Sequence, residues 1–169
     1  MNASAVAPAR EFLESVREVC ESVPDPELPV VTIGDLGIVR HVGVSPSGVV
    51  EVVLTPTYSG CPATEVIRDD VRAALSARGC TEISIRTVLA PAWTTDWITD
   101  DGRRKLAAHG IVPPSGRASA RGVDLELGVR CPRCGSIETR LVSRFGSTPC
   151  QAMYRCTSCL DPFDRIKPY

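Results

Sequence analysis

The sequence lacks any unbroken apolar run of about eighteen residues, so we expect no transmembrane helix. It also lacks an excess of basic residues: 19 Lys and Arg stand against 20 Asp and Glu, and the formal net charge is −1. No overall basic field is therefore present to attract nucleic acid. The residues before Arg10 lack the basic and then apolar pattern of a signal peptide, and we expect a cytoplasmic protein.

The 169 residues suffice for one ordinary domain and a small second one. Helical spacing of apolar residues and β-branched runs predict three helices and three strands before residue 112. The helices are expected at 8–22, 62–78 and 100–109, and the strands at 38–44, 49–54 and 82–89. This order predicts an α/β (α+β) fold, a small mixed sheet covered by helices.

A change in composition marks the expected domain boundary. Residues 113–122 are rich in Pro, Ser, Gly and Ala, which is typical of a linker. We therefore expect one domain over 1–112 and a second over 123–169.

Two Cys-x-x-Cys pairs dominate the second domain: Cys131 with Cys134, and Cys156 with Cys159, with 21 residues between the pairs. Clustered pairs in a chain without a signal peptide favour metal ligands over disulfides. Four thiolates suit a tetrahedral structural zinc ion, and iron of the rubredoxin kind is the alternative. Cys150 has poor spacing for a ligand, and we expect a packed or free thiol.

The segment between these pairs predicts a zinc ribbon. Residues 139–142 and 152–154 can form its strands. Such a module is too small to bury a sufficient core, so the metal must supply folding energy.

Cys61 is the second candidate site. It lies before Pro62, which suits the first position of the helix predicted to follow. Cys61 would then be the N-cap, where free N–H groups and the helix dipole stabilise a thiolate. The alternative is a small residue at a strand-to-helix turn.

Asp25 and Glu27 lie in a stiff loop with three prolines. Such acids can ligate a metal, cap a helix or face water. If Cys61 were an enzyme nucleophile it would need a base, and only His41 and His109 are available, neither in a recognisable pattern.

Three motifs resemble the metal–sulfur cluster assembly domain of SufT-like proteins: Asp25-Pro26-Glu27-Leu28-Pro29, residues 33–39 (IGDLGIV) and residues 55–62 (TPTYSGCP). The C-terminal part is similar to the zinc ribbon of the PaaD (PaaJ) family, a component of phenylacetyl-CoA epoxidase systems. Residues 145–150 (FGSTPC), 154–156 (YRC) and 161–164 (DPFD) carry that likeness.

This resemblance implies a role in maturing the oxygenase that epoxidises phenylacetyl-CoA. It implies that Cys61 contacts iron or an iron–sulfur cluster transiently, with Asp25 and Glu27 nearby. The sequence has two histidines and no Glu-x-x-His, so it is not the di-iron catalytic subunit. It has no Gly-x-Gly-x-x-Gly, so it is not the nucleotide-binding reductase.

We therefore expect an accessory factor that is not itself catalytic and supports iron or cluster insertion into the oxygenase or its reductase. The alternative is a structural subunit that docks on the oxygenase through its ribbon. The expected partners are the epoxidase subunits, with a homodimer as an option, and neither nucleic acid nor a membrane. Five ribbon arginines could contact phosphate or an acidic protein, and the resemblance favours the protein: Arg130, Arg133, Arg140, Arg144 and Arg155.

Overall fold

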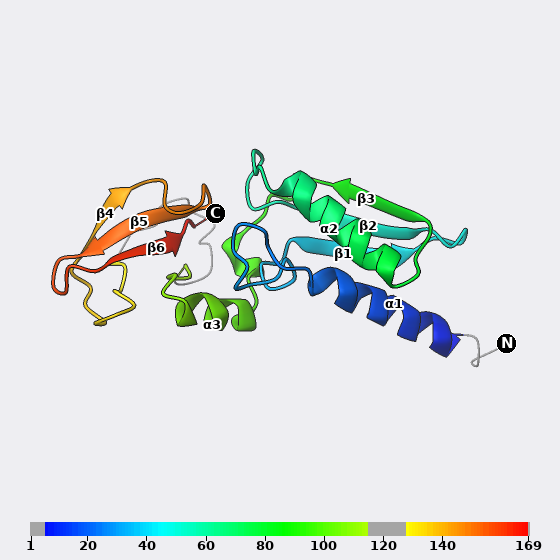
Figure 1. Ribbon diagram of the computed structural model, residues 1–169, viewed down its shortest axis with the longest axis horizontal. Coiled ribbons are helices and arrows are strands. Elements are labelled where there is room, and N and C mark those ends of the chain that lie inside the picture. Colours follow the sequence, from blue (N-terminus) through cyan, green and yellow to red (C-terminus); the bar gives the residue numbers. More distant parts are fainter. Residues whose placement is uncertain (1–5, 115–127, 169) are drawn as a thin grey trace. The chain divides into compact units, whose positions relative to one another are not determined.

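The computed structural model in Figure 1 describes residues 6–114 and 128–168. The chain divides into two compact units, Met1–Trp93 and Thr94–Tyr169. None of the helices within the described ranges has both the length and the apolar character needed to cross a bilayer.

The N-terminal unit is a three-stranded mixed sheet with two helices. Its elements are α1 (Val6–Glu21), β1 (Val39–Val44), β2 (Val50–Leu54), α2 (Thr64–Ala77) and β3 (Ile83–Thr87). The strand order is β1-β2-β3; β1 and β2 form the predicted antiparallel hairpin, and β3 runs parallel to β2. The parallel pair requires a crossover, which α2 supplies. The predicted α+β fold is confirmed.

The core of this unit lies between the sheet and the two helices. Helix α1 packs on α2 and β1, and α2 packs on β3, so both helices cover one side of the sheet. The helical and strand periodicities bring apolar side chains to this layer. Its buried residues include Val16, Cys20, Val42, Val52, Leu54, Ile67, Val71, Leu75 and Ile85.

The loop between α1 and β1 is folded tightly rather than extended. Asp35 Oδ2 accepts a hydrogen bond from the Thr32 N–H at 2.9 Å, and Thr32 Oγ1 accepts one from the Asp35 N–H at 3.0 Å. The Trp93 indole N–H donates to the Leu36 carbonyl at 2.8 Å. This loop carries Asp25 and Glu27, so their positions are determined by packing against the rest of the unit.

The C-terminal unit contains a short 3-10 turn, η1 (Thr95–Trp97), one helix, α3 (Asp100–Ala108), and the strands β4 (Thr139–Ser143), β5 (Gln151–Cys156) and β6 (Pro162–Ile166). Thr99 caps α3, because its side chain accepts a hydrogen bond from the Gly102 N–H at 3.0 Å. The three strands form one antiparallel sheet in the order β4-β5-β6.

Strand β6 was not predicted from the sequence. Its run Pro-Phe-Asp-Arg-Ile contains a single β-branched residue, so local propensity is low. The strand forms because β5 offers a free edge on which Phe163 pairs with Tyr154. Pro162 is tolerated as its first residue, where a missing N–H costs little.

Residues 94–112 group with the C-terminal unit, and Val112 forms a parallel bridge with Arg165 of β6. Most of the expected linker, 113–122, lies outside the described residues. The expected domain boundaries therefore stay a prediction.

Gly34 provides a test of the tight loop. An added Cβ at Gly34 would lie 2.6 Å from both the carbonyl oxygen and the Cβ of Glu21, so backbone must move. We expect Gly34→Ala to lower the free energy of unfolding by about 1–3 kcal/mol, measured by urea denaturation.

Gly60→Ala is the matched control, since its Cβ would meet nothing closer than 3.7 Å, at the Tyr58 ring. Equal stability of Gly34→Ala and Gly60→Ala would contradict the close approach of the loop to α1.

Candidate functional site

The four predicted cysteines of the ribbon converge on one point. Their Sγ atoms all lie within 4.8 Å of one another. The Sγ atoms of Cys131 and Cys159 are 3.7 Å apart, and those of Cys134 and Cys156 are 3.6 Å apart. No two of these cysteines form a disulfide.

These sulfur separations fit a tetrahedral metal site. With zinc–sulfur bonds of about 2.3 Å, the edge of a regular tetrahedron is about 3.8 Å. The backbone N–H of Cys159 donates to Cys156 Sγ at 3.4 Å and is the largest cause lowering the pKa of Cys156, to about 6. A thiolate is the form that binds a metal.

The two Cys-x-x-Cys knuckles have the same backbone design. In each, the N–H of the first cysteine donates to a carbonyl five residues later, Ser136 at 2.8 Å and Asp161 at 3.0 Å. The residue after each second cysteine has a positive φ, 74° at Gly135 and 65° at Leu160. Glycine adopts this conformation freely, whereas a leucine there is strained.

Two arginines brace these knuckles, a role that the sequence analysis missed. Arg130 Nη1 donates to the Gly135 carbonyl at 2.6 Å, and Arg155 Nε donates to the Leu160 carbonyl at 3.2 Å. The signal was present as a repeated Arg-Cys-x-x-Cys. The guanidinium of Arg133 is also engaged within the ribbon, because it forms an ion pair with Asp161 at 2.8 Å.

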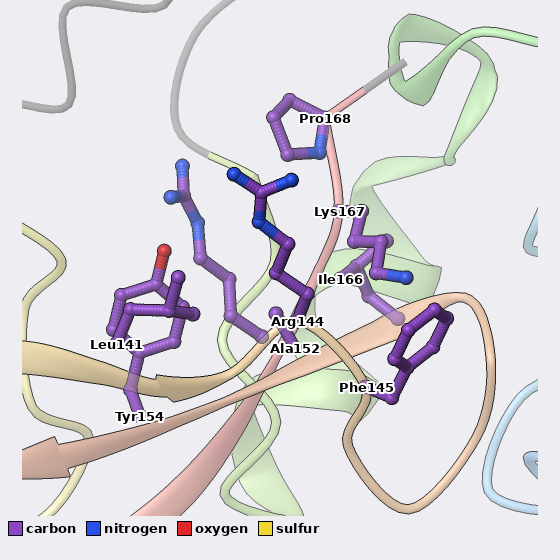
Figure 2. Close-up of a pocket in the computed structure, with 9 residues that line it drawn as sticks. Leu141, Arg144, Phe145, Ala152, Tyr154, Ile166, Lys167 and Pro168 are labelled. Carbon is purple, nitrogen blue, oxygen red and sulfur yellow. The ribbon is translucent and has the colours of Figure 1, made fainter.

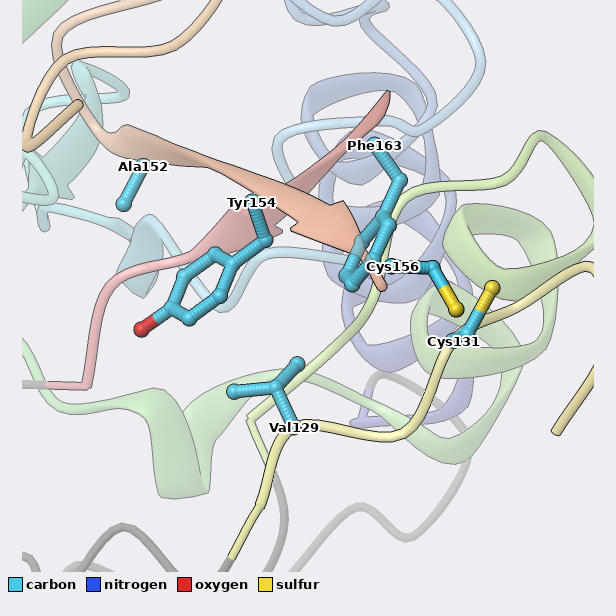
Figure 3. Close-up of a cluster of buried hydrophobic side chains, with 6 residues drawn as sticks. All are labelled: Val129, Cys131, Ala152, Tyr154, Cys156 and Phe163. Atoms are coloured by element: carbon cyan, nitrogen blue, oxygen red, sulfur yellow. The ribbon is translucent and has the colours of Figure 1, made fainter. Parts of the chain in front are cut away.

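The ribbon has a very small core, shown in Figure 3. Among the described residues, six buried ones make it up: Val129, Cys131, Ala152, Tyr154, Cys156 and Phe163. The Tyr154 and Phe163 rings stack with centroids 5.9 Å apart. The sulfurs of Cys131 and Cys156 point toward each other from facing segments. Two of the four ligands are thus also core residues.

Cys150 is buried and lies outside the four-sulfur group. Its Sγ is 3.0 Å from the Thr148 hydroxyl. A packed thiol is what the spacing predicted.

Cys61 is not the N-cap of α2, which corrects the prediction. The helix begins at Thr64 with Ala63 as its cap residue, so Pro62 is not the first helical residue either. The Cys61 carbonyl instead accepts hydrogen bonds from the N–H and hydroxyl of Thr64, at 3.3 and 2.9 Å. Cys61 therefore lies in the turn that leads into the helix.

Asp25 is buried and organises the acidic loop. Its Oδ1 accepts hydrogen bonds from the N–H groups of Glu27 at 2.9 Å and Leu28 at 2.8 Å. Burial raises the pKa of Asp25, and these two N–H groups oppose that rise. Burial and the charge of Asp25 raise the pKa of Glu27.

The structure brings these acids within electrostatic reach of Cys61. Burial raises the pKa of the half-buried Cys61 thiol, and the charges of Glu27 and Asp25 raise it further. The Ala63 N–H and the Thr64 hydroxyl act in the opposite direction. The expected stabilised thiolate is wrong for the free protein, because burial and the acids outweigh the Ala63 N–H and the Thr64 hydroxyl.

The structure does not bring together a metal site made of Cys61, Asp25 and Glu27 alone. Across residues 6–114 and 128–168, only the four ribbon cysteines gather three or more donors closely enough to hold an ion by themselves. His41 lies in β1, and His109 follows α3 with Nδ1 2.8 Å from the Lys105 carbonyl.

Comparison with known proteins shows two families along the chain. Residues 13–85 match the family described as iron–sulfur cluster assembly protein, and residues 115–167 match the PaaD zinc beta ribbon domain. A crystal structure of a domain of unknown function, DUF59, from Bacillus anthracis superposes with a TM-score of 0.55 at 28% identity, covering 60% of this chain and 96% of that one.

Two curated relatives extend this comparison. An Escherichia coli (strain K12) protein that is named as a component of 1,2-phenylacetyl-CoA epoxidase is 46% identical over 97% of this chain and 96% of its own. A Porphyromonas gingivalis protein named Fe-S protein maturation auxiliary factor is 33% identical over 57% of this chain and 94% of its own.

Fold and site thus define an assembly-type domain of the DUF59 class joined to a four-cysteine ribbon. With near full-length similarity to the E. coli protein, the chain belongs to the PaaD family.

The proximity of Glu27 to Cys61 can be tested by alkylation. We expect Glu27→Gln to lower the pKa of Cys61, because it removes a negative charge that disfavours the thiolate. At a fixed pH below that pKa, the thiolate fraction rises, and Cys61 reacts faster with iodoacetamide. The rate is followed by peptide mass spectrometry from mildly acidic to alkaline pH.

Glu65→Gln is the control, since Glu65 pairs with Arg68 on the exposed face of α2. If both variants shifted the alkylation profile of Cys61 equally, Glu27 would have no specific influence on the thiol.

Proposed function

We propose that this chain is an accessory maturation factor of a phenylacetyl-CoA ring epoxidase. It supports insertion of iron or an iron–sulfur cluster into the oxygenase or its reductase. The observation that carries this proposal is the half-buried Cys61 thiol with the carboxylates of Glu27 and Asp25 acting on it. The names of the E. coli and P. gingivalis relatives support it.

The charges around Cys61 favour a cation over nucleophilic chemistry. Burial, and after it the two carboxylates, raise the pKa of Cys61 above its ordinary alkaline value and so favour the protonated thiol in the free protein. Iron reverses this balance, because its positive charge stabilises the thiolate and attracts both carboxylates. Binding then releases the thiol proton, and affinity rises with pH.

A single thiol makes a weak and transient site. The remaining ligands would come from Asp25 and Glu27, a second copy of the chain, a small thiol or the client protein. An incomplete site suits delivery, since a client that offers more ligands can withdraw the cargo. None of the eight cysteines, all of which lie in the described residues, forms a disulfide, in keeping with a reducing cytoplasm.

We propose zinc as the ion of the ribbon. Four thiolates fill a tetrahedral shell and leave no open position, so the ion stabilises the fold and performs no chemistry. The alternative function, a structural subunit that docks through the ribbon, is supported by the closed nature of this site.

The ribbon metal is tested by Cys134→Ser, because Cys134 is exposed and its loss removes a ligand with little loss of packing. We expect the variant to lose its zinc and β4–β6 to lose protection from hydrogen exchange. Structural zinc contributes about 10–16 kcal/mol in isolated zinc-finger peptides, more than a small ribbon can replace. Native mass spectrometry and exchange measurements report the two effects.

Cys80→Ala is the control, as Cys80 lies in the N-terminal unit outside both sites. Retention of zinc and of protection in Cys134→Ser would refute the four-thiolate site.

The cargo site is tested by anaerobic reconstitution with ferrous iron and sulfide. Wild type and Cys80→Ala should bind iron, whereas Cys61→Ala should bind none above background with its zinc unchanged. Equal iron uptake by wild type and Cys61→Ala would exclude Cys61 as the cargo ligand.

A maturation factor is needed only while the epoxidase is assembled, whereas a structural subunit is needed throughout. Epoxidase made together with this chain and then freed of it should stay active if the chain acts in maturation. Loss of activity on removal, regained on adding the chain back, would favour the structural subunit.

A further inference from the structure

A pocket of about 410 Å³ lies in the C-terminal unit, apart from the four cysteines. Leu141 pairs with Tyr154, and Ala152 pairs with Arg165, so the pocket continues the core face of the sheet toward the end remote from Cys156. Its volume is within the range of about 300–1,000 Å³ that is usual for binding pockets.

The pocket is basic. Among the described residues that line it, three are cationic and none is acidic: Arg144, Arg165 and Lys167. Arg144 is exposed and makes no hydrogen bond or ion pair with the described residues, unlike Arg130, Arg133 and Arg155. Its charge is therefore available to an anionic group.

The walls of the pocket are apolar and open to solvent. Leu141 is 45% exposed and Phe145 is 67% exposed, an unusual fraction for an aromatic ring. Figure 2 shows Phe145 beside Lys167 on one side of the pocket and Leu141 with Tyr154 on the other. The Lys167 ammonium lies 4.4 Å from the Phe145 ring centroid.

The loop that presents Phe145 is held in place. Asp164 accepts hydrogen bonds from the N–H and hydroxyl of Ser147, and Gly146 lies so close to Asp164 that a side chain there would displace the carboxylate. The Gly146 N–H donates to the Gln151 carbonyl at 3.0 Å. Phe145 is thus exposed on an ordered loop, as in preorganised binding sites.

We propose that this pocket docks an acidic segment of a partner protein that inserts one aromatic or aliphatic side chain. The apolar walls take the side chain, and the exposed Arg144 attracts the flanking carboxylates. Arg165, which is buried, and Lys167, whose ammonium donates to the Pro149 carbonyl at 2.7 Å, add to the positive potential of the pocket. A protein segment is favoured because β4 is an edge strand, and Val142, which follows the lining residue Leu141 in that strand, is 50% exposed.

The identity of the partner as an epoxidase component rests on the proposed function, but the binding chemistry does not. The pocket and Cys61 lie in different units, so each can be disabled without the other.

The test uses the full, zinc-loaded chain. Displayed random peptides of about ten residues are selected against it, and their affinities are measured by fluorescence anisotropy. We expect enrichment of Asp and Glu around one Phe, Leu, Ile or Trp. Arg144→Glu and Phe145→Ser should each weaken binding by at least about tenfold, and added salt should weaken it too.

Arg140→Glu is the matched control, with the same change of charge on β4 but outside the pocket lining. It should change affinity by less than about threefold. Zinc content of each variant confirms that the ribbon is folded. Cys61→Ala should keep peptide binding, and the pocket variants should keep iron uptake, so failure of either proposal is seen separately.

Several results would overturn the docking proposal. The first is selection of peptides that lack acidic residues, and the second is peptide binding that does not change in Arg144→Glu or Phe145→Ser. The third is displacement of the peptide by inorganic phosphate, with no need for the apolar side chain. The fourth is a dimer of the chain that dissociates in Arg144→Glu. The last two would assign the pocket to a simple anion or to a second copy.

Discussion

The meeting of four sulfurs within 4.8 Å is the constraint on which the ribbon depends. In the described part of the ribbon the core cluster has six buried residues, and two of them belong to the four-sulfur group. Without a cation, closely spaced thiolates would repel one another and open the two knuckles. The knuckles adjoin the ends of β4 and β5, where Thr139 pairs with Cys156 and the Thr157 N–H donates to the Glu138 carbonyl at 2.8 Å.

The two units use sulfur in opposite ways. The ribbon offers four thiols that saturate one ion, which leaves no position for chemistry. The assembly-type domain offers a single thiol, Cys61, whose pKa is raised by burial and then by Glu27 and Asp25. The first arrangement suits an ion that is held permanently. The second suits an ion that arrives with its own positive charge and leaves for a better set of ligands.

Neither the acids nor the arginines act as their residue types alone suggest. Asp25 is a buried acceptor for two backbone N–H groups, and this organises the turn that carries Glu27. Arg130 and Arg155 brace the knuckles, and Arg144 is the one of the five arginines singled out from the sequence that lines the pocket. Local basicity of the ribbon is therefore mostly structural, and its interaction capacity is concentrated at one place.

The sequence by itself determined the three helices, the hairpin, the third strand and the four cysteines that converge in the ribbon, because periodicity and Cys-x-x-Cys spacing are local properties. Only the tertiary structure decided the rest. Strand β6 has weak propensity and exists because β5 offers an edge to pair with. Helix α2 begins at Thr64, so Cys61 is not its cap residue. After burial, the charges of Glu27 and Asp25, from the loop between α1 and β1, raise the pKa of Cys61. Burial and charge proximity depend on distant packing, and for that reason no local pattern revealed the raised pKa of Cys61.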